Sequence, residues 1–85
     1  MKFSYPAIFY PEDDGRYSVI FPDLNELATY GDNRADALAM ASEACRQYLS
    51  AVLSDGEMLP TPTPLAAVCK DKDAAFVKLI SVEVP

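Results

Sequence analysis

Apolar and polar side chains alternate along the first residues of the chain. If residues 2–9 are extended, four side chains lie on one side of the backbone: Phe3, Tyr5, Ala7 and Phe9. A period of two with aromatic residues predicts a β-strand. Pro6 has no N–H group, so we expect one flank of this strand to be unpaired at that point, or to be a sheet edge.

The alternation returns over residues 16–21, where Tyr17, Val19 and Phe21 oppose the residues between them. Residues 11–15 between the two runs are rich in turn formers, and Gly15 can take the positive φ that closes a loop. The two runs therefore predict an antiparallel hairpin. Its second face carries three large apolar residues opposite Phe9, Val19 and Phe21: Ile8, Tyr10 and Ile20.

After Pro22-Asp23, residues 27–30 predict a third strand, and the pattern then becomes helical. Asn33 is a good helix N-cap, and Asp36 sits where a carboxylate favours the helix dipole. From residue 34 the apolar stripe has three-to-four spacing: Leu38, Ala41, Cys45, Tyr48 or Leu49, and Val52. Gly56 suits the position just past a helix, so we expect the helix to end near Ser54 or Asp55.

Three prolines at alternate positions make residues 60–64 an extended connector, because proline cannot continue a helix. Residues 75–84 are β-rich and predict a last strand. The order β-β-β-α-β predicts an α+β fold of two layers, an antiparallel sheet with one helix on one face. Eighty-five residues suit one domain, 1–85, whose thin core favours homo-oligomerisation.

The formal net charge of −6 narrows the kinds of molecule that the protein is expected to bind. Nucleic-acid binders need a cationic surface, whereas the seven Lys and Arg residues here are scattered. A basic protein is the favoured partner, and the alternative is that acidity only maintains solubility. The absence of a long apolar run or a leader predicts a cytoplasmic protein without membrane contact.

Catalytic chemistry has little support in the residues. The chain has no histidine, which removes the commonest general base and metal ligand. Cys45 lies on the apolar stripe and is expected in the core, and Cys69 beside Lys70 has no base to activate it. Converging carboxylates can hold Mg²⁺, although the positions of the six candidates fit turns better: Glu12, Asp13, Asp14, Asp23, Glu26 and Asp32. We therefore expect no enzyme activity, metal or cofactor.

A single helix covers only one face of the predicted sheet. The other face, with Ile8, Tyr10 and Ile20, is expected to meet water or a partner. Tyrosines beside acidic residues are typical of binding surfaces, although scattered apolar residues on a surface are also normal.

Several short motifs together resemble the HicB family of antitoxins over roughly residues 5–53. The matching residues are Tyr5-Pro6-Ala7, Glu12-Asp13, Gly15, Tyr17, Val19, Phe21-Pro22-Asp23-Leu24, Thr29, Gly31-Asp32, Ala37 and Ala44. This chain has Asn25-Glu26-Leu27 where the family usually has Pro-Gly-Cys after Asp-Leu. Many members also continue into a helical DNA-binding segment, whereas this sequence stops at Pro85.

The resemblance implies a partial RNase-H-like fold and a partner, HicA, a small basic toxin that cleaves mRNA. Binding would cover the surface of the toxin that holds RNA, and the segment that would bind DNA is not expected in residues 1–85. Candidate partner-binding residues lie on exposed elements: Tyr10, Glu12, Asp13, Asp14, Asp23, Asn25 and Glu26. The alternatives are that these residues only shape turns, that the chain is a stand-alone dimeric regulatory or structural module, or that it is a divergent RNase-H-like nuclease.

Overall fold

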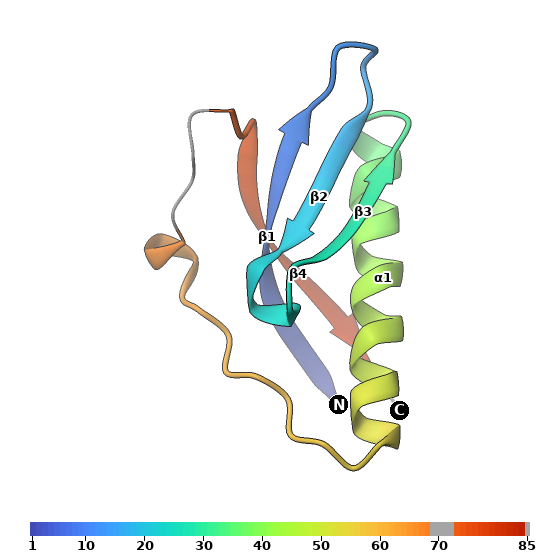
Figure 1. Cartoon of the computed structure of the whole chain (residues 1–85), viewed down its shortest axis with the longest axis vertical. Coiled ribbons are helices and arrows are strands. Elements are labelled where there is room, and N and C mark those ends of the chain that lie inside the picture. The colour runs from blue at the N-terminus through green and yellow to red at the C-terminus, as the bar shows by residue number, and fades with distance from the viewer. Residues whose placement is uncertain (69–72, 85) are drawn as a thin grey trace.

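The computed structural model describes residues 1–68 and 73–84 and confirms the predicted order of elements. Figure 1 shows four strands and one long helix that runs the length of the sheet. The elements are β1 (Lys2–Pro11), β2 (Tyr17–Phe21), β3 (Leu27–Gly31), α1 (Arg34–Ser54) and β4 (Phe76–Glu83). Two short 3₁₀ turns were not predicted: η1 (Pro22–Leu24) and η2 (Leu65–Ala67).

The strands form one antiparallel sheet in the order β3-β2-β1-β4. The first strand in sequence is therefore central. It pairs with β4 from Lys2 to Phe9 but with β2 only from Ile8 to Pro11. Pro6 thus lies where the β2 side of the strand has no strand partner, as its missing N–H predicted.

Hydrogen-bond direction along the sheet follows from the hairpin. The Glu12 N–H donates to the Arg16 carbonyl at 2.8 Å, so these two residues, just beyond the ends of β1 and β2, turn main-chain groups toward each other. In an antiparallel ladder every second pair does so, and Ser18 and Ile20 therefore turn their main-chain groups toward β1. Tyr17, Val19 and Phe21 turn theirs toward β3.

The core lies between the sheet and α1, on the face with Tyr5, Phe9 and Val19. The helix contributes mainly small buried residues: Ala37, Ala41, Cys45 and Leu49. Small residues allow a close approach, which is tightest at the end of β3. A Cβ on Gly31 would collide with the main-chain nitrogen of Ala37, so only glycine fits there.

Both ends of α1 match the predicted caps. The Asn33 side chain accepts a hydrogen bond of 2.9 Å from the Asp36 N–H, and the Asp36 carboxylate accepts one from the Asp32 N–H. At the other end Gly56 has φ +74, and its N–H donates to the Leu53 carbonyl. The following N–H, of Glu57, donates to Val52, which completes a Schellman motif.

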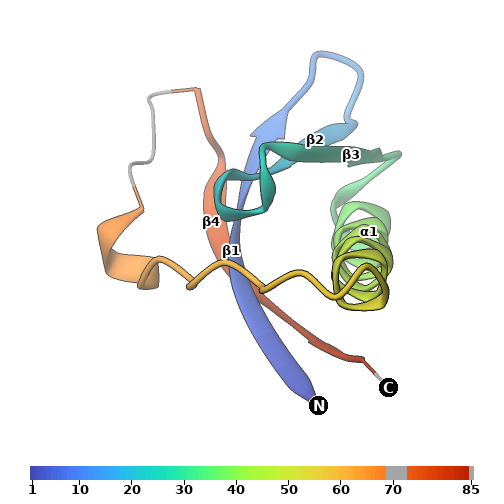
Figure 2. The ribbon, with the colours of Figure 1, turned by 60° about the horizontal axis from the view of Figure 1, so that its bottom comes forward.

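The chain after α1 covers part of the sheet face that the sequence predicted to be uncovered. We call the sheet face that points away from α1 the outer face, and residues 57–68 the connector. The connector leaves the helix end, where the Tyr5 hydroxyl donates to the Pro60 carbonyl at 2.6 Å, and passes to the outer side of the sheet (Figure 2). Ile8, expected to be open to a partner, is 7% exposed and shares a small hollow with Pro22 and Val68. The prediction that one whole face is uncovered was wrong, because the connector returns over part of it.

Candidate protein-binding face

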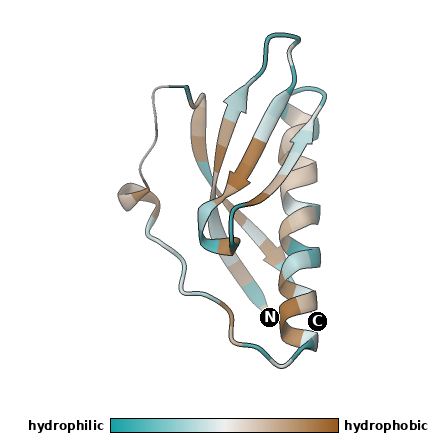
Figure 3. Ribbon diagram, in the orientation of Figure 1, coloured by the Kyte–Doolittle hydropathy of each residue, from teal (hydrophilic) through white to brown (hydrophobic). Residues whose placement is uncertain are grey.

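The seven candidate binding residues fall into two groups at opposite ends of β2. One group lies at the hairpin loop between β1 and β2: Tyr10, Glu12, Asp13 and Asp14. The other lies in the turn between β2 and β3: Asp23, Asn25 and Glu26. Five residues of strand separate them by roughly 16 Å. The hairpin loop is hydrophilic in Figure 3, and the turn is hydrophilic apart from a short hydrophobic stretch.

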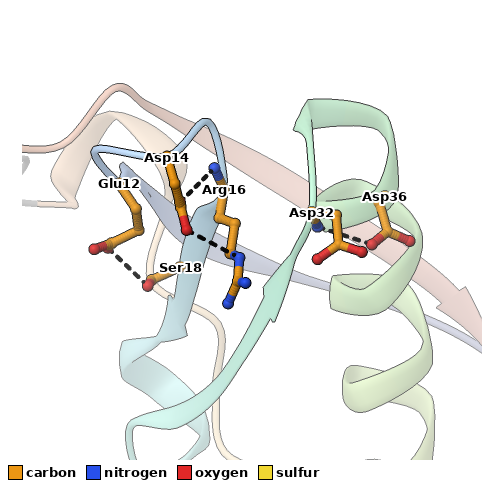
Figure 4. A network of polar contacts seen from close by, with 6 residues as sticks. All are labelled: Glu12, Asp14, Arg16, Ser18, Asp32 and Asp36. Atoms are coloured by element: carbon orange, nitrogen blue, oxygen red, sulfur yellow. Dashed lines mark hydrogen bonds and ion pairs between the residues drawn. The ribbon is translucent and has the colours of Figure 1, made fainter.

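The hairpin group forms a shallow polar hollow on the outer face. Glu12 accepts a hydrogen bond of 2.9 Å from the Ser18 hydroxyl, and Asp14 pairs with the Arg16 guanidinium at 3.1 Å (Figure 4). The hollow measures about 270 Å³ and is lined by Glu12, Asp14, Arg16, Ser18 and Tyr30. Asp13 is exposed at the loop. All of these carboxylates reach solvent, so a cationic group can approach them without a large desolvation cost.

Two tyrosines stand in one row across the outer face. Tyr10 is opposite Ser18 on β2, and Ser18 is opposite Tyr30 on β3. Tyr30 is 58% exposed. Its place on this face was available from the alternation over residues 27–31, although sequence reasoning did not select it. Ile20 and Ala28 continue the face in the next row.

Asp32 and Asp36 add negative charge at the same end of the molecule. They come from the junction of β3 and α1, and Figure 4 shows them across β3 from Glu12 and Asp14. The hairpin group thus belongs to a larger acidic end that includes two carboxylates not chosen as binding residues.

The turn group is arranged differently, because Asp23 is engaged within the chain. Its two carboxylate oxygens accept bonds of 2.7 Å from the Thr63 N–H and the Thr63 hydroxyl. Asn25 and Glu26 follow with φ values of 59° and 57°, in the left-handed region that costs a side-chain-bearing residue energy. Both are exposed. Asp23 therefore shapes the turn and fixes the connector, while Asn25 and Glu26 remain available on the surface.

The cysteines give no sign of reactivity in the described part of the chain. Cys45 is fully buried among core residues, and burial raises the pKa of its thiol to about 11. Burial also raises the pKa of the nearby Tyr5 hydroxyl. Cys69 and the Lys70 beside it lie outside the described residues.

Neither a group of possible metal ligands nor a membrane-spanning helix is found in the part of the chain that the structure describes. Within residues 1–68 and 73–84, no three His, Cys, Asp or Glu side chains are grouped so that they could hold a metal ion. Among the same residues, no helix has the length and apolar character needed to cross a membrane.

Residues 5–85 match the family described as HicB-like antitoxin of bacterial toxin–antitoxin systems. Antitoxin HicB 1 of Photorhabdus laumondii is 39% identical over 61 residues, which are 72% of this chain and 39% of that protein. Antitoxin HicB of Escherichia coli K12 is 34% identical over 61 residues, 44% of its length. The chain thus spans less than half the length of either relative.

A solved toxin–antitoxin complex from Streptococcus pneumoniae contains a chain with a similar fold. Its TM-score is 0.86 at 28% identity, over 98% of this chain and 70% of that chain. The similarity therefore includes the connector and β4, beyond the motifs of residues 5–53.

Proposed function

Because the chain belongs to the HicB-like antitoxin family, we propose that residues 1–85 act as one antitoxin domain that neutralises a small basic toxin of the HicA type. The domain covers the surface with which the toxin binds and cleaves mRNA. It needs no catalysis of its own for this, since occlusion is a binding function.

The acidic end of the sheet is the observation that carries the proposal. Glu12, Asp13, Asp14 and Asp32 are exposed around the hairpin and the end of β3, beside Tyr10 and Tyr30 on the outer face. A ribonuclease holds RNA phosphates with cationic groups. Carboxylates can occupy the same groups, and tyrosines supply contact area with little conformational entropy to lose.

The role of each candidate follows from its contacts. Tyr10, Glu12, Asp13 and Asp14 contact the toxin directly from the hairpin end, and Asn25 with Glu26 contacts it from the far turn. Asp23 contributes through the shape of that turn, because Thr63 already engages both of its carboxylate oxygens.

Reconstitution tests the proposal. The purified domain and a HicA-type toxin are mixed, the complex is measured by calorimetry, and cleavage of a defined RNA by the toxin is followed as antitoxin is added. We expect a stoichiometric complex and loss of cleavage at the same molar ratio. A complex that leaves cleavage intact would refute occlusion, and the absence of any complex would refute the antitoxin assignment of this domain.

A further inference from the structure

The two edges of the sheet differ in a way that bears on how a partner docks. One edge is β3 and the other is β4. Since Val19 turns its main-chain groups toward its β3 partner Thr29, the alternate residues Ala28 and Tyr30 turn theirs outward. Within the described part of the chain, no hydrogen bond beyond the ladder is made by these outward N–H and C=O groups. The β3 edge therefore presents two donors and two acceptors.

The β4 edge carries the protection that β3 lacks. Lys78 stands in the middle of β4, and a lysine there is a common obstacle to the addition of another strand. The turn η2 also packs beside β4. By contrast β3 has no proline, lysine or bulge in its five residues.

The negative charges around the β3 edge favour an added strand that carries basic residues. Glu26 precedes β3 and Asp32 follows it, and both are exposed. Residues 17–33 contain three acidic residues and no basic one. A strand with Lys or Arg at both ends would pair with the two carboxylates, since opposite charges directly across a sheet attract.

A second copy of this chain fits the edge poorly. Antiparallel self-pairing centred on Thr29 places Ala28 opposite Tyr30, which gives the longest overlap of the edge. The same register places Glu26 of one copy opposite Asp32 of the other at both ends, and like charges in those positions repel. Any homo-oligomer of this protein is therefore expected to use another surface.

The helix α1 packs against β3 on the core face of the sheet. Gly31 lies against Ala37, and positions three and seven residues later fall on the same side of a helix. Met40 and Ala44 occupy these positions and are half-buried. An added strand would thus extend the sheet over a small, partly apolar part of α1 and gain burial as well as main-chain hydrogen bonds.

From these observations we propose that the β3 edge is a strand-docking site for an extended segment of the basic toxin, with cationic residues opposite Glu26 and Asp32. This inference rests on the proposed function, because it takes the toxin as the partner. It adds the main-chain groups of Ala28 and Tyr30 to the contact and gives Tyr30 a place beside the docked strand.

Amide hydrogen exchange in the complex tests the site directly. Exchange of individual amides is measured by NMR for the domain alone and with purified HicA-type toxin in excess. We expect the Ala28 and Tyr30 amides to exchange at least about tenfold more slowly in the complex, as for a new main-chain hydrogen bond. The outward amides of Leu79 and Ser81 on β4 should be unchanged. Equal exchange at Ala28 and Tyr30 with and without toxin overturns the inference.

A pair of proline variants supplies the functional arm. Ala28→Pro removes an outward donor and blocks the edge while sparing the ladder with β2, and Leu79→Pro does the same at the β4 edge. With folding checked by circular dichroism, Ala28→Pro should weaken toxin binding by about tenfold or more and Leu79→Pro by much less. Equal losses in two folded variants would contradict a specific β3 site.

The outcomes separate the two proposals. If wild-type protein and toxin form no complex, the proposed function fails and the docking site fails with it. If they form a complex in which β3 is neither protected nor sensitive to Ala28→Pro, the docking site alone is wrong. A toxin-free dimer with protected Ala28 and Tyr30 amides would show that a second copy, and not the toxin, fills the edge.

Discussion

Asp23 accepts two hydrogen bonds of 2.7 Å from Thr63, one from the main-chain N–H and one from the side-chain hydroxyl. The contact joins the turn after β2 to the connector, forty residues further along the chain. It fixes the path by which the chain crosses to the outer face. Asp23, which the sequence suggests as a binding carboxylate, therefore has a structural role.

Removing the hydroxyl of Thr63 should loosen the connector. Thr63→Ala leaves one Asp23 oxygen without its partner, and we expect the free energy of unfolding to fall by about 1 kcal/mol. Thr63→Ser keeps the hydroxyl and should cost less. Urea denaturation measures both. If Thr63→Ala and Thr63→Ser were equally stable, the hydroxyl contact would have no energetic role.

Substitution of Gly31 should destabilise the fold strongly. A Cβ at this position would collide with the Ala37 main chain, which cannot move without shifting the helix, so Gly31→Ala should cost about 3 kcal/mol or more. Gly15→Ala is the matched control. Gly15 has a positive φ but an added Cβ would meet no atom within 4 Å, so this change should cost only about 1 kcal/mol. Comparable losses in thermal unfolding would rule out steric contact as the cause.

Charge reversal at the hairpin should weaken toxin binding in a salt-dependent way. The double variant Glu12→Lys with Asp13→Lys changes the net charge by the same amount as Glu43→Lys with Glu57→Lys, which lie on α1 and just after it. We expect the first pair to raise Kd by about tenfold at low salt and by less at high salt, because screening weakens exposed charges.

The matched pair on and after α1 should change Kd only slightly. If both double variants weakened binding equally, net charge and not the hairpin would account for the effect. An unchanged Kd for the hairpin variant at every salt concentration would remove Glu12 and Asp13 from the interface.

The buried thiol of Cys45 predicts a pH dependence of stability. Its pKa is raised by burial to about 11, so below the usual pKa of a thiol both the folded and the unfolded chain keep the proton. As the pH rises toward 11 the unfolded chain loses a proton that the folded chain retains, and the free energy of unfolding falls. In a Cys69→Ser background, urea midpoints should therefore decline between about pH 9 and 11. Cys45→Ala should flatten that decline, and an equal decline in its absence would exclude the thiol as the source.

The strands, the helix and its caps could be predicted because each depends on near neighbours. Asn33, Gly15 and Gly56 act within a few residues of their own positions, and the alternation of Tyr17, Val19 and Phe21 directly reflects one buried face. Such signals are local, and the structure confirms them.

The path of the connector could not be predicted, since it depends on contacts between distant residues. Neither Asp23 nor Thr63 indicates its partner by spacing, and the burial of Ile8 follows from where the connector passes. The same limit applies to the candidate site. The acidic hairpin was evident from Glu12 to Asp14, whereas the place of Tyr30 beside it depends on the register of β2 with β3.

The central position of β1 has a consequence for the order in which the fold is completed. Residues 2–9 are synthesised well before residues 76–83, with which one whole flank of them pairs. The hairpin and α1 can form from local contacts, but the middle of the sheet keeps an unsatisfied edge until residues 76–83 have left the ribosome. Closure across so many residues is slow, and the waiting strand is the part of the nascent chain most exposed to wrong pairing.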